Sequence, residues 1–327
     1  MRDTIIKMGH GSGAKLTNDL IKEVFDKNFN LPGLEDGIEI ENRTVVSTDS
    51  HVIKPLFFPG GDIGKLAVNG TVNDVAMKGA VPKYLLITYI IEEGLPIADL
   101  KKITKSVQKA AENAGVRIIA GDTKVVERGK ADGVYITTTG IGYLPDKIDL
   151  SASKIQDGNE ILINGALGEH SVAIINAREN MDLQPPPESD CDALNHLAQE
   201  MIKLSKVNFM RDITRGGLAT ILNEIYQETN LGIIIEAKNI PVNEQVDAIC
   251  EMLGLDPLYL ANEGKFVAIM EPDNKNMLNQ IKNNTLAKNA AIIGKVTKDL
   301  NGVFLRTEIG SLRPLLMQDS DPLPRIC

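Results

Sequence analysis

Aspartate residues beside or near glycines recur in five stretches of the chain and could together bind a metal–nucleotide complex. The stretches are STDSH (47–51), FFPGGDIGK (57–65), GTVNDVAMKGA (70–80), AGDTKV (120–125) and RDITRGG (211–217). Four of them place an Asp beside a turn or at the edge of a predicted element, whereas Asp74 lies inside a predicted helix. Carboxylates at such points can hold Mg²⁺, which prefers oxygen ligands and shares them with phosphate groups. Glycines let the backbone approach phosphates, and Lys65 and Lys124 would offset the remaining charge.

Each of these motifs also has a plain structural explanation. An Asp beside a glycine is often a turn former or a helix cap. The standard nucleotide-binding motifs are missing: GGDIGKL has too few residues between its glycines for a P-loop, and Leu66 stands where Ser or Thr would be needed. GHGSGAK (9–15) does not fit the dinucleotide pattern. This segment, which ends in Lys15, is either a loop over a triphosphate or a frayed N-terminus.

Two further residues carry groups that suit catalysis. Glu263 lies in YLANEGK (259–265), just before a predicted strand, where it is a general base, a metal ligand or a solvated turn residue. Cys327 is the last residue and follows a proline-rich segment, so we expect its thiol to be exposed. The alternative is a disordered end with an incidental cysteine. Prenylation is a poor fit, because its signal places the cysteine four residues from the end.

The other cysteines and the histidines give weaker signals. Cys191 and Cys250 fall in helical patterns and are expected to be ordinary core or surface residues. Three cysteines are too few, and odd in number, for a disulfide framework. The four histidines have no metal-ligand spacing, which argues against a zinc site. His51 follows Asp49 closely, so it either lines a site or is structural.

The elements that would position these residues alternate between strands and helices. A helix is predicted over 97–114, with Gly115 as its stop. A polar, turn-rich linker at 145–158 separates two halves that both mix strands and helices, so the fold class is α/β (α+β) with two domains. The predicted strands are 44–50, 81–91 (long and buried), 116–122, 134–144, 160–163, 232–236 and 265–271, and the remaining predicted helices are 168–180, 190–206 and 216–229.

Composition restricts the class of protein. The chain has 327 residues, 43% of them hydrophobic, which is enough for two cores. Its net charge of −9 argues against a nucleic-acid-binding protein, because phosphate backbones require clustered Lys and Arg. There is no window apolar enough for a membrane span and no apolar leader at the N-terminus. We therefore expect a cytoplasmic protein without nucleic-acid or membrane partners.

Taken together, the motifs resemble those of a known family. The stretch from STDSH to GAVP (47–82), with AGDTKV, DITRGG and NEG and the terminal PRIC, is similar to the HypE hydrogenase maturation factors. That family belongs to the group of aminoimidazole ribonucleotide synthetase and selenophosphate synthetase. The resemblance runs from about Met8 to Cys327, and the PRIC ending narrows it to HypE. One small departure is Ala14, because the family loop is richer in glycine.

The resemblance implies a PurM-like fold in which the N-terminal domain dimerises into a β-barrel and a C-terminal α+β domain packs against it. The expected segments are a glycine-rich loop and helix (1–40), an ATP-binding domain (41–150), a C-terminal domain (151–310) and a mobile tail (311–327). The resemblance implies that the Mg²⁺ ligands are Asp49, Asp62, Asp74 and Asp212. The implied nucleotide contacts are Asp49, Asp62, Lys65, Asp74, Asp122, Gly11, Gly13 and Lys15. The implied catalytic residues are Cys327, Glu263 and Lys124.

The resemblance also implies an activity. Such a protein spends ATP to dehydrate a carbamoyl group on its C-terminal cysteine to a thiocyanate, with HypF as carbamoyl donor and the HypC–HypD complex as cyanide acceptor. The product supplies the cyanide ligand of the [NiFe] hydrogenase iron. Two alternatives stay open at this point. One is another ATP-dependent enzyme of the same group, such as a small-molecule kinase or a selenophosphate-synthetase-like enzyme, and the other is a non-catalytic scaffold for maturation partners.

Overall fold

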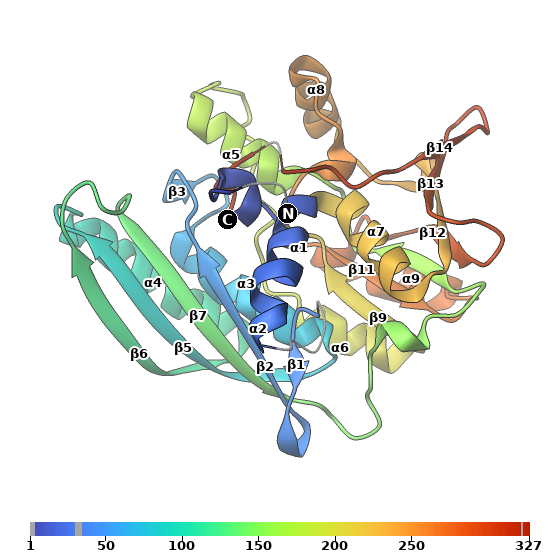
Figure 1. The fold of residues 1–327 in the computed structure, drawn as a ribbon, viewed down its shortest axis with the longest axis horizontal. Coiled ribbons are helices and arrows are strands. Elements are labelled where there is room, and N and C mark those ends of the chain that lie inside the picture. Colours follow the sequence, from blue (N-terminus) through green and yellow to red (C-terminus); the bar gives the residue numbers. More distant parts are fainter. Residues whose placement is uncertain (1–3, 30–34, 322) are drawn as a thin grey trace.

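Two mixed β-sheets with flanking helices make up the chain (Figure 1). The computed structural model describes residues 4–29, 35–321 and 323–327. The two sheets lie in the N-terminal and C-terminal halves of the sequence, which confirms the predicted two-part mixture of helix and strand. Among the described helices, none has both the length and the apolar character needed to cross a bilayer.

The first sheet has the strand order β1-β2-β7-β5-β6. β5 and β6 are parallel, as expected for two strands joined by a helix, and the other neighbours are antiparallel. Its strands, the small hairpin β3–β4 and its two helices are β1 (Ile38–Glu39), β2 (Thr44–His51), β3 (Phe57–Phe58), β4 (Gly61–Asp62), α3 (Ile63–Met77), β5 (Val81–Glu92), α4 (Ile97–Ala114), β6 (Arg117–Val126) and β7 (Val134–Tyr143).

The second sheet has the order β14-β13-β10-β12-β8-β11-β9. Its elements are β8 (Glu160–Ile163), α5 (Glu169–Glu179), α6 (Asn195–Leu204), β9 (Val207–Asp212), α7 (Gly217–Thr229), β10 (Gly232–Glu236), α8 (Glu244–Leu253), β11 (Phe266–Met270), α9 (Lys275–Ile281), β12 (Ala291–Thr297), β13 (Val303–Arg306) and β14 (Leu312–Pro314). β14 lies within the segment that was expected to be a mobile tail.

The N-terminal segment contacts the C-terminal segment of the chain. It forms a 3₁₀ turn (Met8–Gly11), α1 (Lys15–Leu20), a π-helical turn (Ile21–Asp26) and α2 (Lys27–Phe29). The backbone N–H groups of Lys15 and Leu16, at the start of α1, donate to the carbonyls of Gln318 and Asp319. The two ends of the chain therefore lie close together near the middle of the molecule (Figure 1).

Helix α3 connects the two halves. Almost every residue from Ile63 to Met77 is buried, because the helix packs on the first sheet and also contacts α6 and β9 of the second half. Asn73 fixes this contact: its side chain donates to the carbonyl of Asp192 and accepts from the N–H of Leu194. Packing α3 against β9 brings residues of the two halves to one place.

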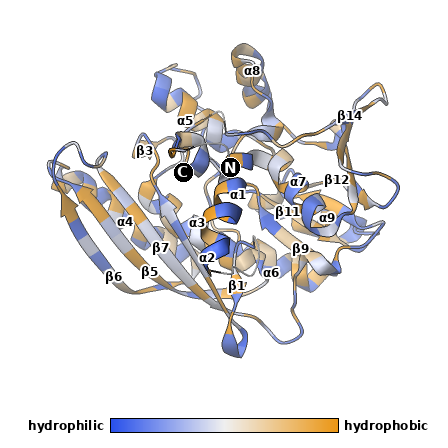
Figure 2. Ribbon diagram, in the orientation of Figure 1, coloured by the Kyte–Doolittle hydropathy of each residue, from blue (hydrophilic) through white to orange (hydrophobic). Residues whose placement is uncertain are grey.

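Strand β6 is the outer strand of the first sheet and is exposed along nearly its whole length. Figure 1 shows α3 and α4 behind this sheet, with no helix over β5 and β6 on the side facing the viewer. Hydrophobic residues occur along these strands (Figure 2), among them Ile90, Ile118, Ile119 and Val125, which are all exposed. An edge of this kind is available for pairing with another chain.

Several sequence predictions are confirmed and others need correction. The helix over 97–114 forms as predicted, and Gly115 ends it with a φ of 70°. The strand at 81–91 forms but is only half buried, because one face is left open. The predicted helix at 190–206 begins only at Asn195, and Cys191 lies in the loop before it. Strands β9, β12 and β13 and helix α9 were not predicted, whereas Cys250, which falls in a helical pattern of the sequence, lies in α8.

Asp62 caps the connecting helix, and this gives a first testable prediction. Its Oδ1 accepts the backbone N–H groups of Gly64 and Lys65 at 2.7 and 3.0 Å. Replacing Asp62 by Ala should lower the free energy of unfolding by about 1 kcal/mol, because these two donors lose their partner. Asp62→Asn keeps an acceptor oxygen and should lose much less. Urea denaturation measures both, and equal losses in the two variants would contradict a capping role.

Candidate active site at the junction of the two halves

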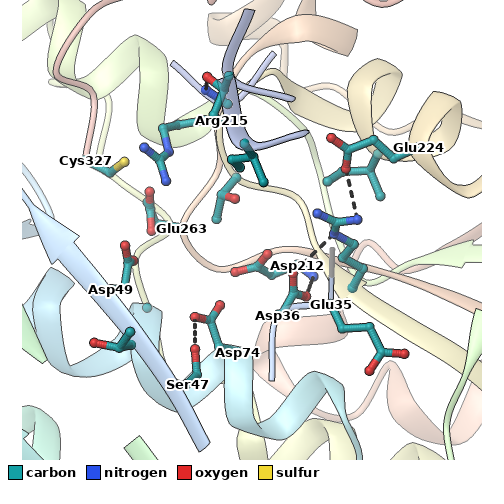
Figure 3. A pocket seen from close by; sticks show the side chains of 18 of the residues that line it. Glu35, Asp36, Ser47, Asp49, Asp74, Asp212, Arg215, Glu224, Glu263 and Cys327 are labelled. Carbon is teal, nitrogen blue, oxygen red and sulfur yellow. Dashed lines mark hydrogen bonds and ion pairs between the residues drawn. The ribbon is translucent and has the colours of Figure 1, made fainter. Parts of the chain in front are cut away.

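A polar cavity of about 350 Å³ lies where the two halves meet. β2, α3 and β9 each contribute one to three polar residues to its lining, and loops complete the wall (Figure 3). It is lined by Gly13, Thr17, Asn18, Ile21, Glu35, Asp36, Ser47, Thr48, Asp49, Gly70, Asp74, Arg211, Asp212, Thr214, Arg215, Ile221, Glu224, Glu263 and Cys327. The cavity thus brings together acidic residues, an arginine, and the terminal thiol.

Three carboxylates form its floor. Asp36, Asp74 and Asp212 each offer one oxygen, and these oxygens all lie within 4.8 Å of one another. Ser47 Oγ donates to Asp74 Oδ2 at 2.7 Å, and the N–H of Asp212 donates to Asp36 Oδ2 at 3.3 Å. Among the described residues this is the group whose spacing suits a metal ion. Oxygen-only ligands at this spacing are typical of Mg²⁺ or Ca²⁺.

The electrostatics of the cluster favour a bound cation. Burial, followed by the charge of neighbouring carboxylates, raises the pKa of both Asp74 and Asp212 well above the usual range. Burial also raises the pKa of Asp36 to about 6, against the opposing effect of Arg211. Buried like charges disfavour ionisation of one another unless a positive charge joins them. A divalent cation would supply that charge.

Arg211 supports one wall of the cavity. Its Nε lies 3.2 Å from Asp36 Oδ1, and a terminal nitrogen lies 2.9 Å from Glu224 Oε2. The other oxygen of Glu224 accepts a hydrogen bond from Asn18 Nδ2 at 2.8 Å. This chain of contacts links α1, β9 and α7 through buried polar groups, so it fixes Asp36 beside the other two carboxylates.

The NEG segment holds Glu263 in the cavity. Asn262 anchors the segment, because its Oδ1 accepts the N–H of Gly168 at 2.8 Å and its Nδ2 donates to the carbonyl of Ile213 at 3.1 Å. Gly264 packs directly on the loop before α6: a Cβ there would lie 1.9 Å from the carbonyl oxygen of Asp190. Asn and Gly are therefore required on either side of the acidic residue.

Glu263 itself is buried and chemically unusual. It is 4% exposed, and its Oε1 has no hydrogen-bond partner among the described residues. Its carboxylate points between Asp49, Arg215 and Cys327 (Figure 3). Burial, then the charges of Asp212 and other carboxylates, raises its pKa well above the usual range. Its burial in the cavity excludes a solvated turn residue, so the general base and the metal ligand remain as predictions.

Cys327 is not exposed, so that sequence prediction is wrong. The residue is 9% exposed and its side chain lines the cavity beside Glu263 and Arg215 (Figure 3). The end of the chain is held because the N–H of Val52 donates to the Cys327 carbonyl at 3.1 Å. Burial is the main cause of a pKa for the thiol that lies well above its ordinary value. The thiol is therefore protonated at neutral pH while the tail is docked.

Known proteins are similar to this chain over nearly its whole length. Family models described as AIR synthase related protein match residues 35–144 (N-terminal domain) and 156–305 (C-terminal domain). Carbamoyl dehydratase HypE of Cupriavidus necator is 47% identical over 332 residues, covering 98% of this chain and 95% of that protein. The chain belongs to the HypE family.

Two solved structures of the family are similar to the whole fold. The crystal structure of a HypE–HypF complex contains a chain that is 44% identical, with a TM-score of 0.88. The match covers 91% of this chain and 99% of that one. A HypE structure in complex with ATP is 38% identical, with a TM-score of 0.84, and covers 99% of this chain and 100% of that one. These matches show the PurM-like, two-domain fold class that the resemblance implied.

Among the residues implied by the HypE resemblance, only some lie at the cavity. Asp49, Asp74, Asp212, Glu263 and Cys327 line it together. Gly13 lines it as well, with a φ of +75° and no room for a Cβ, which would lie 2.4 Å from Arg215 Cβ.

The other implied residues lie elsewhere in this chain. Asp62 caps α3, and Lys65 donates to the carbonyl of Gly60 at 3.1 Å, away from the cavity. Asp122 and Lys124 form an ion pair of 2.5 Å with each other on exposed β6. The carbonyl of Gly11 accepts from Arg215, and Lys15 is exposed, 3.8 Å from Asp319. His51 lies buried behind the cavity, its Nε2 3.2 Å from Asp49 Oδ2.

Three residues that line the cavity, Asp36, Arg211 and Arg215, were not predicted from the sequence. Asp36 precedes Gly37, which is the same Asp–Gly pattern that was noted elsewhere, and Arg211 and Arg215 lie within the RDITRGG stretch that drew attention for its Asp. Attention to the arginines of that stretch would have found two of the three.

The raised pKa values of the three floor carboxylates predict that the free energy of unfolding depends on pH. An unfolded Asp releases its proton near pH 4, whereas burial raises the pKa of folded Asp36 to about 6 and also raises the pKa of Asp74 and Asp212. Between these values the folded state binds more protons, so without divalent cations the cluster's contribution to the free energy of unfolding falls as the pH rises. Asp74→Asn, which can still accept from Ser47, should therefore raise the melting temperature of the metal-free protein at pH 8.

Thermal unfolding in EDTA at pH 5.5 and pH 8 measures this effect. Asp146→Asn changes an exposed carboxylate of the linker and serves as the control, with no expected change. A variant Asp74→Asn that melts below the wild type at pH 8 would show that the cluster is not repulsive.

Proposed function

We propose that this chain is an ATP-dependent carbamoyl dehydratase that acts on its own terminal cysteine. A carbamoyl group carried on Cys327 as an S-carboxamide would be converted to a thiocyanate, which supplies the cyanide ligand of the [NiFe] hydrogenase iron. The observation that carries the proposal is that the sulfur of the last residue lies in the same cavity as Glu263 and the carboxylate floor. The HypE relatives named carbamoyl dehydratase, and the HypE structure with ATP, support it.

The chemistry requires an activated oxygen and the loss of two protons. The carbamoyl oxygen is a poor leaving group, so it attacks the γ-phosphorus of ATP and ADP departs. Loss of one proton from nitrogen leaves an O-phosphorylated imidate, and loss of the second proton with expulsion of phosphate forms the C≡N bond. Cys–S–C(=O)NH₂ and ATP thus give Cys–S–C≡N, ADP and phosphate. Phosphoryl transfer of this kind depends on positioning and charge neutralisation.

Glu263 is our candidate for the proton-transferring group. Its carboxylate lies beside Cys327, where the carbamoyl nitrogen would be, and its raised pKa makes the ionised form a stronger base than an exposed glutamate. Arg215 lies beside both the sulfur and Glu263, and its positive charge opposes the rise of that pKa, which favours the ionised carboxylate. The guanidinium also suits the negative charge that develops on the carbamoyl oxygen.

Asp36, Asp74 and Asp212 would hold Mg²⁺, and Asp49 would lie close enough to assist. Their raised pKa values and close oxygens fit a divalent cation. When bound, Mg²⁺ supplies the positive charge that lets a triphosphate approach an acidic cavity. We leave Asp62 out of this set, since both hydrogen bonds that its side chain accepts come from the helix that it caps.

We also propose the partners that the family implies. HypF would donate the carbamoyl group and the HypC–HypD complex would accept the cyanide; a HypE–HypF complex is known for a relative. Since the thiol is only 9% exposed, the tail must leave the cavity for both transfers and return for the dehydration between them.

Removing the terminal sulfur tests the proposed reaction directly. Purified protein is incubated with a HypF-type carbamoyl donor, carbamoyl phosphate and ATP, and the C-terminal peptide is followed by mass spectrometry. We expect the wild type to gain a carbamoyl group and then lose one water, and Cys327→Ser to form no thiocyanate. Glu263→Gln should accept the carbamoyl group but dehydrate it about a hundredfold more slowly or worse.

Cys250→Ala, on α8, is the matched control and should behave like the wild type. ATP turnover that persists undiminished in Cys327→Ser would instead favour a kinase of the same group that acts on a free small molecule.

A homodimer formed through β6 is the final part of the proposal. The strand is an exposed edge with exposed Ile118, Ile119 and Val125, and Asp122 and Lys124 lie on it. We expect the wild type to sediment as two chains and Ile119→Glu as one, because a buried glutamate would destabilise the interface. Ile97→Glu changes an equally hydrophobic and more exposed residue of α4, and should remain dimeric. A monomeric wild type would overturn this part.

A further inference from the structure

The guanidinium of Arg178, on α5, binds the backbone of the docked tail. Its NH1 donates to the carbonyl of Pro324 at 3.0 Å, and its NH2 donates to the carbonyl of Arg325 at 3.0 Å. NH2 and Nε also donate to the carbonyl of Lys54, at 2.7 and 3.1 Å. One side chain therefore joins three carbonyl oxygens, two from the tail and one from the segment that follows β2.

A second residue of the same helix binds the next carbonyl. His170 is fully buried, and its Nε2 lies 2.8 Å from the carbonyl oxygen of Ile326. Because that oxygen can only accept, Nε2 carries the proton, and Nδ1 accepts from Ser189 Oγ at 2.7 Å. Burial lowers the pKa of His170, which keeps the ring neutral and this tautomer in place. Arg178 and His170 together are called the tail clamp below.

The tail also pairs with the chain that continues β2. The N–H of Val52 donates to the carbonyl of Cys327, and the N–H of Lys54 donates to that of Arg325 at 3.4 Å. The side chain of Arg325 returns to this segment through Nε, which donates to the Val52 carbonyl at 2.8 Å. Asp49 lies on the same strand, three residues before Val52. The position of the tail is thereby tied to a wall of the cavity.

The loop before α6 links the clamp to Glu263. Ser189 orients His170, and the next residue, Asp190, accepts the N–H of Glu263 on Oδ1 at 3.0 Å. The other oxygen of Asp190 lies 2.9 Å from Lys265 Nζ, which fixes the carboxylate. Two consecutive residues thus hold the two groups that must meet, the end of the tail and the candidate base.

We propose that Arg178 and His170 are positioning residues that hold the tail backbone so that the group on the Cys327 sulfur meets Glu263. This inference rests on the proposed function. The hydrogen bonds from the clamp to the tail all go to main-chain carbonyls, so the clamp leaves the sulfur free and binds the thiol, the carbamoylated and the cyanated tail alike. Arg178 and His170 do not touch the reacting atoms; they set where those atoms lie. A partner that collects the tail has to break these hydrogen bonds.

Alkylation of Cys327 measures the clamp without any ATP chemistry. Arg178 is half-buried on the surface of α5, so Arg178→Gln should fold. Its loss removes charged hydrogen bonds, and we expect iodoacetamide to modify Cys327 at least about tenfold faster than in the wild type. Arg178→Lys, which keeps a charge but a smaller donor set, should lie between the two. Arg306→Gln, which removes an arginine paired with Glu236 on the far sheet, is the matched control.

Single-turnover dehydration of the pre-carbamoylated protein supplies the second readout. Arg178→Gln should lower the dehydration rate at least about tenfold while the KM for ATP stays unchanged, since the nucleotide cavity is intact. Unchanged alkylation would overturn the clamp, and faster alkylation with an unchanged dehydration rate would overturn its positioning role. If the wild type itself dehydrates nothing, the proposed function fails, and the alkylation rates still decide whether Arg178 holds the tail.

Discussion

Repulsion among buried carboxylates is the interaction on which the site depends. Asp36, Asp74 and Asp212 come from three separate parts of the chain, and α3 packed against β9 holds two of them at close range. A fold that brings like charges together has an unfavourable energy, which a bound cation or protonation of the carboxylates relieves. A rigid junction keeps these carboxylates together, because a flexible one would let them separate and ionise independently.

The same rigidity places demands on the tail. The chain supplies its own substrate group on a segment held by backbone hydrogen bonds, beside a glutamate held by the NEG segment. An attached substrate reacts at high effective concentration, provided its position is well defined. Each hydrogen bond that defines the position also has to be broken when the tail leaves, so accurate placement and rapid exchange with partners oppose each other.

The sequence predicted the fold class and most of the long elements, because hydrophobic periodicity and the glycine at 115 are local signals. It also identified Asp49, Asp74, Asp212, Glu263 and Cys327, which the structure brings to one cavity. It could not separate Asp62 from this group, since a helix cap and a metal ligand look alike in an Asp–Gly context. Burial of Cys327 was not predictable either, because the contacts of Arg178 and His170 with the tail join residues more than a hundred positions apart.

The burial of the sulfur has a consequence for the protein between reaction cycles. Peroxides and other electrophilic oxidants attack the thiolate, and attack requires access. The docked Cys327 is protonated, because burial raises its pKa, and little of it is open to solvent. Idle molecules should therefore resist conversion to sulfenic or sulfinic acid, and oxidative damage should fall mainly on those whose tail is in transit. The docked state therefore protects the Cys327 thiol from oxidation between reaction cycles.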